Sequence, residues 1–349
     1  MKSPLALLLG MSVSGLLALA PSASAADAPP AAPAAKPAAA QPAAPASASF
    51  PKAEKLLEPK PLVFGHKVVP LFPPGHPALK AGPGSDKDEE FKPGKDRPNA
   101  VVNIHNPSIE LYLAPPDKAN GMSVILSPGG GNNTCNVGPE GVDVANWLNG
   151  LGVSCFVHRY RLKPYGSATD ALLDTQRAVR VVRAHAKEWN IDPNKIGHMG
   201  FSAGGEQTAR LALTFDAGTP DAADPIDRVS SRPDWVVLIY PGWVPDTVDM
   251  AKVPKNVPPT FLVCAGTGDV FHAKQTVDFY NAVFEAGRVM KPKPLNVEMH
   301  IYGTGGHGGS IFANKKSHPF SHWPERFVEW ATDLGMLPAA KAPEAAAGK

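Results

Sequence analysis

Short apolar segments alternate with amphipathic helical patterns through most of this chain, and this alternation constrains the fold more than any other feature. The predicted strands are residues 109–113, 123–127, 153–158, 196–199, 236–240, 261–264 and 297–301. The predicted helices are residues 142–148, 169–189, 203–215, 274–286 and 324–334. Strands that are apolar throughout are typical of a sheet buried on both faces. The order of elements therefore predicts an α/β fold with a mostly parallel central sheet and helices on both faces.

The N-terminal region differs in composition from the rest of the chain. Lys2 precedes an apolar segment over residues 5–20 and the small-residue string Ala23-Ser24-Ala25, which is typical of a cleaved secretory signal peptide, with a membrane anchor as the alternative. Alanine and proline dominate the residues that follow, up to Ser49, and this composition predicts a disordered linker. The predicted organisation is a signal peptide (1–25), a linker (26–60), one large α/β domain (61–338) and a disordered tail (339–349). We expect the mature protein to be periplasmic or secreted.

Charge and cysteine content exclude several classes of partner. The 349 residues carry 34 Lys+Arg against 32 Asp+Glu, and this balance argues against a nucleic-acid partner. The mature chain has no segment of about twenty apolar residues, so we expect no membrane span. Three cysteines allow at most one disulfide, and none has the spacing of a metal site. We expect buried thiols at Cys155 and Cys264 and no metal or cofactor, while the state of Cys135 and the oligomeric state are left open.

The segment from Ile196 to Gly205 contains the strongest local signal for chemistry. It reads as a strand, then Gly200-Phe201-Ser202-Ala203-Gly204, then a helix. Glycines on both sides allow the sharp turn that exposes a serine in a nucleophile elbow, and the following helix directs its free N–H groups to the same point. This context favours Ser202 as a nucleophile over a serine in an ordinary turn.

A serine hydrolase also needs N–H donors for the oxyanion that develops in the reaction. One donor is expected from Ala203, the residue after the nucleophile, and others from a loop after an early strand. The segment Pro128-Gly129-Gly130-Gly131 follows such a strand, and we choose Gly129 and Gly130 as donors. A phosphate-binding loop and a plain turn are the alternatives, although no Lys-Ser/Thr pair follows as a P-loop requires.

The base and the acid are expected in loops after the last two strands, at the same sheet edge as the elbow. His307 is surrounded by glycines in the loop after residues 297–301, which makes it an unusual residue for a packed core. Asp269 is the acid candidate after residues 261–264. Its role would be to orient the imidazole and to stabilise the imidazolium.

Several longer segments resemble one known family. They are residues 128–131, 141–148, 158–162, 200–205, 227–234, 258–262 and 300–302. From about Leu71 to Leu337 the chain is similar to exported bacterial α/β-hydrolases that include acetylxylan and feruloyl esterases, often labelled as xylanases. The resemblance implies an α/β-hydrolase fold and a metal-free Ser-His-Asp esterase acting on acyl groups of plant polysaccharides. The stretch from Pro245 to Pro258 is short, so we expect a small or absent lid. Asn132 and Glu206 stand where this family usually has an aromatic residue and a histidine, and Thr267-Gly268 stand where it usually has paired aspartates.

The predicted function is that of an exported serine esterase that removes acetyl or feruloyl groups from a polysaccharide or oligosaccharide through an acyl-enzyme. Candidate substrate-binding residues near the predicted site are Asn132, Glu140, Glu206 and Trp243. A general carboxylesterase and a peptidase of the same fold are alternatives within enzymes. A catalytically weak glycan-binding module is the alternative from a different class.

Overall fold

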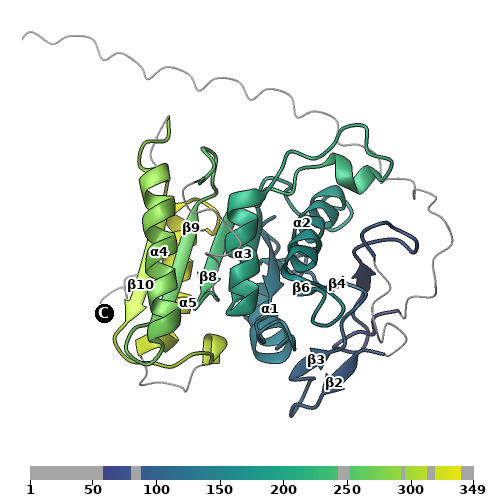
Figure 1. Ribbon diagram of the computed structural model, residues 1–349, viewed down its shortest axis with the longest axis horizontal. Helices are drawn as coiled ribbons and strands as arrows, with labels where there is room; N and C mark the ends of the chain where they lie inside the picture. Colours follow the sequence, from purple (N-terminus) through teal and green to yellow (C-terminus); the bar gives the residue numbers. More distant parts are fainter. Residues whose placement is uncertain (1–57, 80–87, 243–251, 292–294, 313–318, 339–349) are drawn as a thin grey trace, which may run out of the picture. The chain divides into compact units, whose positions relative to one another are not determined.

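The computed structural model describes residues 58–79, 88–242, 252–291, 295–312 and 319–338, and these lie in one compact unit that spans residues 43–349 (Figure 1). The predicted signal peptide, most of the predicted linker and the predicted tail lie outside the described residues. None of the helices among those residues has the length and apolar character that a membrane crossing requires.

An eight-stranded sheet forms the centre of this unit. Its spatial order is β1 (Val68–Pro70), β4 (Ser108–Tyr112), β6 (Ser154–Arg159), β5 (Ser123–Ser127), β7 (Ile196–Phe201), β8 (Trp235–Ile239), β9 (Thr260–Ala265) and β10 (Val297–Tyr302). Neighbouring strands from β6 to β10 run parallel. Strand β4 is antiparallel to both β1 and β6. The sheet is therefore mostly parallel, as the sequence predicts.

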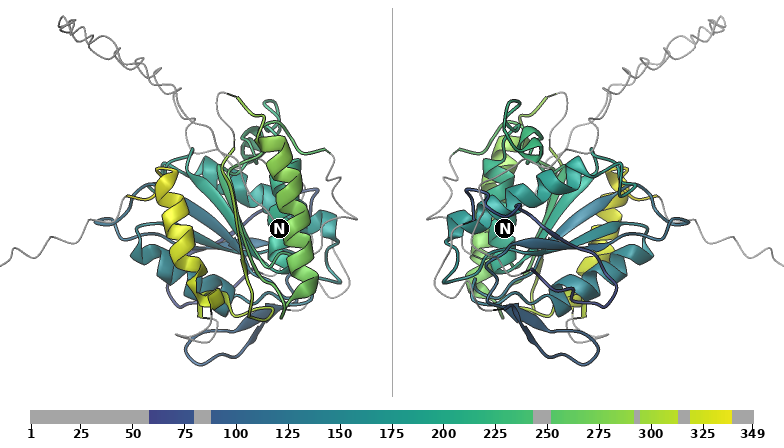
Figure 2. Two further views of the ribbon diagram at one scale, coloured as in Figure 1. Left: turned by 90° about the vertical axis from the view of Figure 1, so that its left-hand side faces the viewer. Right: turned by 90° about the vertical axis from the view of Figure 1, so that its right-hand side faces the viewer.

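Helices cover both faces of the sheet, which Figure 2 shows edge-on with α5 on one side and α4 on the other. The helices are α1 (Asp143–Gly150), α2 (Ala168–Ala184), α3 (Ala203–Thr214), α4 (Val270–Gly287) and α5 (Trp323–Asp333). Alternation along the strands explains the two layers, because successive side chains of a strand point to opposite faces. Trp235 and Val237 of β8 pack in the cluster that contains α1 and α5, whereas Val236 packs with α3 and α4. Each strand thus contributes to a core on both sides.

All seven predicted strands and all five predicted helices are present, and the differences lie at their ends and in short elements. Helix α2 ends at Ala184 rather than at residue 189, and α4 begins at Val270, four residues before the predicted start. Strands β1, β2 (Glu90–Lys92) and β3 (Ala100–Val102) were not predicted, and they have three residues each. Three residues are too few for a strand to show its alternation.

Candidate active site

Ser202 lies in the sharp turn between β7 and α3. Its backbone has φ 51° and ψ −116°, a conformation that a non-glycine residue rarely adopts. The turn is held by the neighbouring strand, because Ser202 N–H donates to Ile239 at 3.0 Å and Ser202 C=O accepts from Gly242 N–H at 2.7 Å. A Cβ on Gly204 would lie 1.9 Å from the carbonyl oxygen of Ser127, so only glycine fits there. The strained position therefore depends on packing around the turn.

The structure brings Ser202, His307 and Asp269 into one hydrogen-bonded chain. Ser202 Oγ lies 2.8 Å from His307 Nε2, and His307 Nδ1 lies 2.9 Å from Asp269 Oδ2. A carboxylate only accepts hydrogen bonds, so the hydrogen of neutral His307 is assigned to Nδ1 and Nε2 is free to accept the serine hydrogen. Asp269 is buried, whereas 38% of the His307 side chain is exposed. This is the geometry that a serine nucleophile, a base and an orienting acid require.

Asp269 and His307 reach each other because their loops follow two paired parallel strands. Ala265 at the end of β9 pairs with Tyr302 at the end of β10, so both loops start at the same edge of the sheet. The loops then touch at Gly268, where a Cβ would lie 1.5 Å from the carbonyl oxygen of Gly305. Glycine at position 268 is thus what lets the two loops approach.

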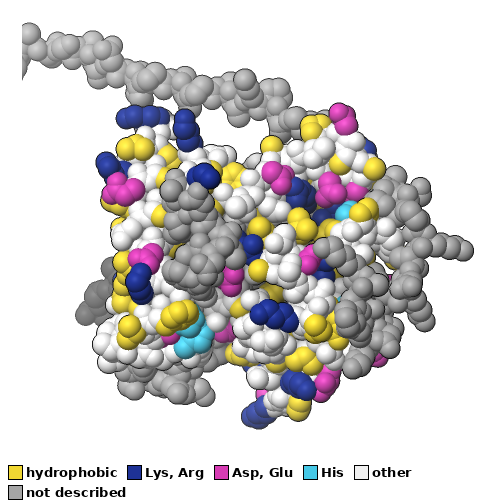
Figure 3. Space-filling model, in the orientation of Figure 1, with side chains coloured by type: hydrophobic (Ala, Val, Ile, Leu, Met, Phe, Trp, Pro, Cys, Tyr) yellow, Lys and Arg dark blue, Asp and Glu magenta, His cyan; other side chains and the backbone are white. Residues whose placement is uncertain are grey.

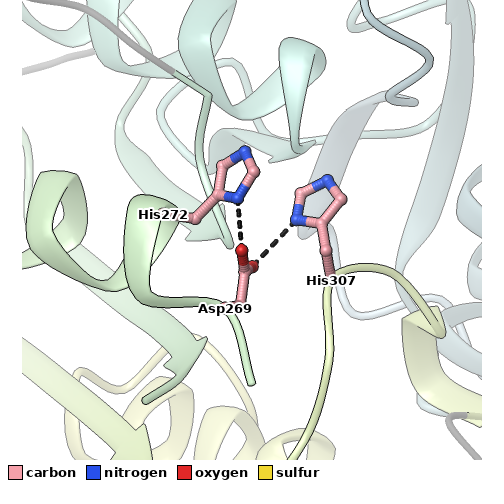
Figure 4. Close-up of side chains that lie close together, drawn as sticks. All are labelled: Asp269, His272 and His307. Carbon is pink, nitrogen blue, oxygen red and sulfur yellow. Dashed lines mark hydrogen bonds and ion pairs between the residues drawn. The ribbon is translucent and has the colours of Figure 1, made fainter. Parts of the chain in front are cut away.

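His272 is a second histidine at this site and was not predicted from the sequence. Its Nδ1 lies 2.5 Å from Asp269 Oδ1, and its ring stacks on that of His307 with 3.8 Å between centroids and 17° between planes (Figure 4). Burial lowers the pKa of His272, the hydrogen bond to Asp269 opposes this shift, and the neighbouring His307 adds to it. The position of His272 three residues after the acid, in the first turn of a helix, is the signal that places it beside that acid.

The glycine loop after β5 lies against the serine, but the structure corrects the predicted role of Gly129. A Cβ on Gly129 would lie 2.8 Å from Ser202 Cβ, so the loop is in contact with the serine. However, Gly129 N–H donates to Glu140 Oε2 at 2.7 Å and is therefore not available to an oxyanion. Two of the three predicted oxyanion donors therefore remain. They are Gly130, which has φ 132°, and Ala203, which is the first residue of α3.

Glu140 is also placed differently from the prediction. It is 5% exposed, so its carboxylate lies beneath the site rather than on the surface that a substrate would meet. Its other oxygen accepts from the Tyr240 hydroxyl at 2.8 Å. Burial raises the pKa of Glu140, opposed by hydrogen bonds from Gly129 and Tyr240 and by the nearby His307. Glu140 is therefore a structural support for the loop.

Asn132 and Glu206, predicted to line the site, are brought together by the structure. Burial raises the pKa of Glu206, and Arg210, Lys163 and a hydrogen bond from the Asn132 side chain oppose that rise. Asn132 has φ 60° and belongs to the loop that touches Ser202, whereas Glu206 lies one turn into α3. Trp243, the fourth candidate, lies outside the described residues. The three cysteines are buried free thiols.

These features define the class of protein as an α/β-hydrolase. The strained serine lies between a parallel strand and a helix, the acid follows β9, and the histidine follows β10. Comparison with known proteins agrees with this class. The family model described as BD-FAE matches residues 109–230, which include the glycine loop and the elbow.

Parts of the chain are similar to an acetylxylan esterase and to a protein named as a xylanase. It is 35% identical to an acetylxylan esterase of Xylanibacter ruminicola over 126 residues, which are 36% of this chain and 24% of the relative. It is 29% identical to endo-1,4-beta-xylanase B of Butyrivibrio fibrisolvens over 255 residues, covering 65% of this chain and 36% of that one. The chain thus spans between about a quarter and a third of the length of these relatives.

Solved structures show the same fold over a larger share of the chain. A crystal structure of an acetyl ester-xyloside bifunctional hydrolase from Caldicellulosiruptor lactoaceticus has a TM-score of 0.63 and 28% identity, covering 78% of this chain and 97% of that one. A thermophilic esterase from Thermogutta terrifontis has a TM-score of 0.52 and 19% identity over 68% of this chain and 93% of that one, a likeness in fold alone.

Proposed function

We propose that the chain is an exported serine carboxylic ester hydrolase that removes acetyl or feruloyl groups from plant polysaccharides or oligosaccharides. The observation that carries this proposal is the continuous chain from Ser202 through His307 to Asp269 at a strained elbow. Hydrogen bonds of 2.8 and 2.9 Å join the hydroxyl, the base and the acid. Such an arrangement activates a serine that is otherwise a weak nucleophile.

The first half of the reaction follows from the hydrogen positions. Ser202 Oγ attacks the ester carbonyl carbon while His307 Nε2 takes the hydroxyl proton, and the negative charge that forms on the carbonyl oxygen is held by the N–H groups of Gly130 and Ala203. Collapse of this intermediate breaks the bond to the alcohol, which leaves with the proton from Nε2. Asp269 stabilises the imidazolium between the two steps.

In the second half, water replaces the alcohol. His307 Nε2 takes a proton from water, the resulting hydroxide attacks the acyl carbon, and the acid product leaves as the proton returns to Ser202 Oγ. Both halves of the reaction thus balance with the ester, water, and the side chains and backbone N–H groups named above.

Features around the site support a bulky, sugar-bearing alcohol. Phe271 is 63% exposed and its ring centroid lies 5.1 Å from that of His272, so an exposed aromatic ring lies beside this histidine. Exposed aromatic rings offer an apolar surface with a polar rim nearby, which suits the face of a sugar ring. The names of the acetylxylan esterase and the acetyl ester-xyloside hydrolase agree with such a substrate.

The charge distribution and the predicted export support a neutral polymer outside the cell as the substrate. On the face shown in Figure 3, Lys and Arg side chains are interspersed with Asp and Glu, which gives no single-sign field for a charged partner. The sequence of residues 1–25 supports export, to the periplasm or the medium.

The test is initial-rate hydrolysis of p-nitrophenyl acetate, a feruloyl ester and acetylated xylan by the wild type, Ser202→Ala and Asp269→Asn. We expect release of acetate from xylan, with rates lower by at least about 10³-fold in both variants because neither retains the complete chain. Release from p-nitrophenyl acetate alone would favour a general carboxylesterase. Equal rates for the wild type and Ser202→Ala would contradict the enzyme and favour a glycan-binding module.

A further inference from the structure

Two clusters of histidine and carboxylate side chains in the described part of the chain hold ligand atoms within 4.8 Å of one another. The first consists of Asp269, His272 and His307, and the second of His76, Asp224 and Asp227. Arg177 donates to both aspartates of the second cluster, with 2.7 Å between Nη1 and Asp227 Oδ1, so a guanidinium already supplies the positive charge there. The carboxylate of the first cluster receives its hydrogen bonds from two imidazoles instead.

We propose that Asp269, His272 and His307 form a Zn²⁺-binding site whose occupation inhibits the esterase. Two imidazoles and one carboxylate, with water as the fourth ligand, are a donor set that zinc favours. The inhibitory consequence rests on the proposed function, whereas metal binding itself does not.

The geometry of the cluster needs little adjustment to hold the ion. Zinc bonds of 2.0–2.2 Å in a tetrahedron separate the ligand atoms by about 3.4 Å. His272 Nδ1 lies 2.5 Å from Asp269 Oδ1 and His307 Nδ1 lies 2.9 Å from Asp269 Oδ2, so these two pairs must open by about 0.9 and 0.5 Å. All the ligand atoms of the cluster lie within 4.8 Å of one another. Figure 4 shows both Nδ1 atoms facing the same carboxylate from neighbouring rings. The cluster is accessible because His307 is 38% exposed.

Metal binding at Nδ1 would change the hydrogen position on His307. A neutral imidazole has one N–H, so coordination of Nδ1 requires the hydrogen to reside on Nε2, with solvent carrying it from one nitrogen to the other. Nε2 lies 2.8 Å from Ser202 Oγ and must accept the serine proton. An Nε2–H cannot accept it. The ion thus inhibits by fixing the wrong tautomer and by displacing the hydrogen bond between His307 and Asp269.

Zinc binding is tested first without catalysis. Ser202→Ala keeps all three ligands, and calorimetric titration of that variant with Zn²⁺ is expected to show one site per chain. Addition of His272→Gln, or of His307→Gln in a second protein, is expected to weaken this binding by at least about tenfold, because each removes one ligand. The matched control is His185→Gln, because His185 pairs with Glu188 at 2.9 Å with the same three-residue separation but at the exposed end of a helix.

Inhibition is then measured on the active protein after treatment with EDTA. We expect Zn²⁺ to lower the rate of p-nitrophenyl acetate hydrolysis in the wild type and in His185→Gln, with EDTA restoring it. His272→Gln is expected to need at least about tenfold more Zn²⁺ for half-inhibition. Equal zinc affinity with and without His272 and His307 would overturn the site. Zinc binding through these residues in a protein that hydrolyses no ester would support the site and contradict the proposed function instead.

Discussion

Glu140 shows at the residue scale how one buried carboxylate joins segments that are distant in the sequence. It accepts from Gly129 in the glycine loop and from Tyr240 at the end of β8. The Tyr240 hydroxyl in turn accepts from Ser310 N–H at 3.2 Å, and the Tyr240 ring lies edge-on to His307 with 4.9 Å between centroids. The glycine loop and the histidine loop are therefore held to each other through Glu140 and Tyr240.

Replacement of Glu140 by glutamine is expected to destabilise the protein and to lower its esterase rate. In the wild type the carboxylate of Glu140 accepts from two donors, Gly129 N–H and the Tyr240 hydroxyl. The glutamine side chain would present its NH₂ group to one of them, so one buried hydrogen bond becomes a repulsive contact. We expect a loss of about 1–3 kcal/mol in the free energy of unfolding, measured in urea. Glu329→Gln on the exposed face of α5 is the control and should change stability by less than about 0.5 kcal/mol. Unchanged stability in Glu140→Gln would mean that Glu140 is already a donor, as a protonated acid.

At the scale of elements, the site is a consequence of strand order. Strands β9 and β10 are parallel neighbours, and Gly266 N–H donates to Tyr302 at 2.7 Å just beyond their last pair. The loops that carry Asp269 and His307 therefore start together and stay in contact through Gly268 and Gly305.

Gly268→Ala is expected to lower kcat by about a hundredfold. The added Cβ would lie 1.5 Å from the Gly305 carbonyl oxygen, so the loops must separate, and a shift of about 1 Å in a catalytic group costs about that factor. Gly303→Ala in the same histidine loop is the matched control, because its Cβ would meet nothing within 4 Å. Steady-state rates with p-nitrophenyl acetate distinguish the two variants. Equal kcat values for both would contradict the proposed contact between the loops.

At the scale of the whole molecule, a buried cluster of polar side chains joins neighbouring strands of the central sheet to α3. Ser127 Oγ lies 2.9 Å from His158 Nδ1 and 3.2 Å from His198 Nε2, and His198 Nδ1 lies 2.8 Å from Thr208 Oγ1. Both imidazoles are fully buried. Burial lowers the pKa of His158 well below its usual value, with His198 adding to the effect, and it lowers the pKa of His198 to about 3.

Stability is therefore expected to fall as the pH drops below about 6.5, the ordinary pKa of histidine. Below that pH the unfolded chain binds protons that the folded chain does not, so the free energy of unfolding decreases by up to about 1.4 kcal/mol per pH unit for each histidine, down to about pH 3 for His198. Urea unfolding between pH 7 and 4.5 measures this slope. His198→Gln should reduce the slope by one histidine's share, whereas His322→Gln at an exposed position is the control. The same slope in wild type and His198→Gln would contradict the depressed pKa.

The sequence by itself determined the order of elements and the candidates of the site. Seven compact apolar segments predict the strands, and the glycines around Ser202 predict the sharp turn. Both signals depend on neighbouring residues alone, through side-chain alternation, burial and permitted backbone angles, so they can be recognised in the sequence. The order of serine, acid and histidine along the chain placed each candidate after a particular strand. The sequence alone therefore predicts Ser202, Asp269 and His307, and the structure joins them by hydrogen bonds.

Only the tertiary structure decided how those candidates are used. Gly129 has its N–H directed at Glu140, and His272 shares Asp269 with His307, because segments far apart in sequence meet there. No periodicity or spacing in the sequence indicates where the Gly129 N–H group points or which side chains contact the two oxygens of Asp269. Hydrogen bonds between loops depend on how the whole domain packs. The sequence pattern can therefore predict which residues form the site, but only the tertiary structure shows which residues they bond to.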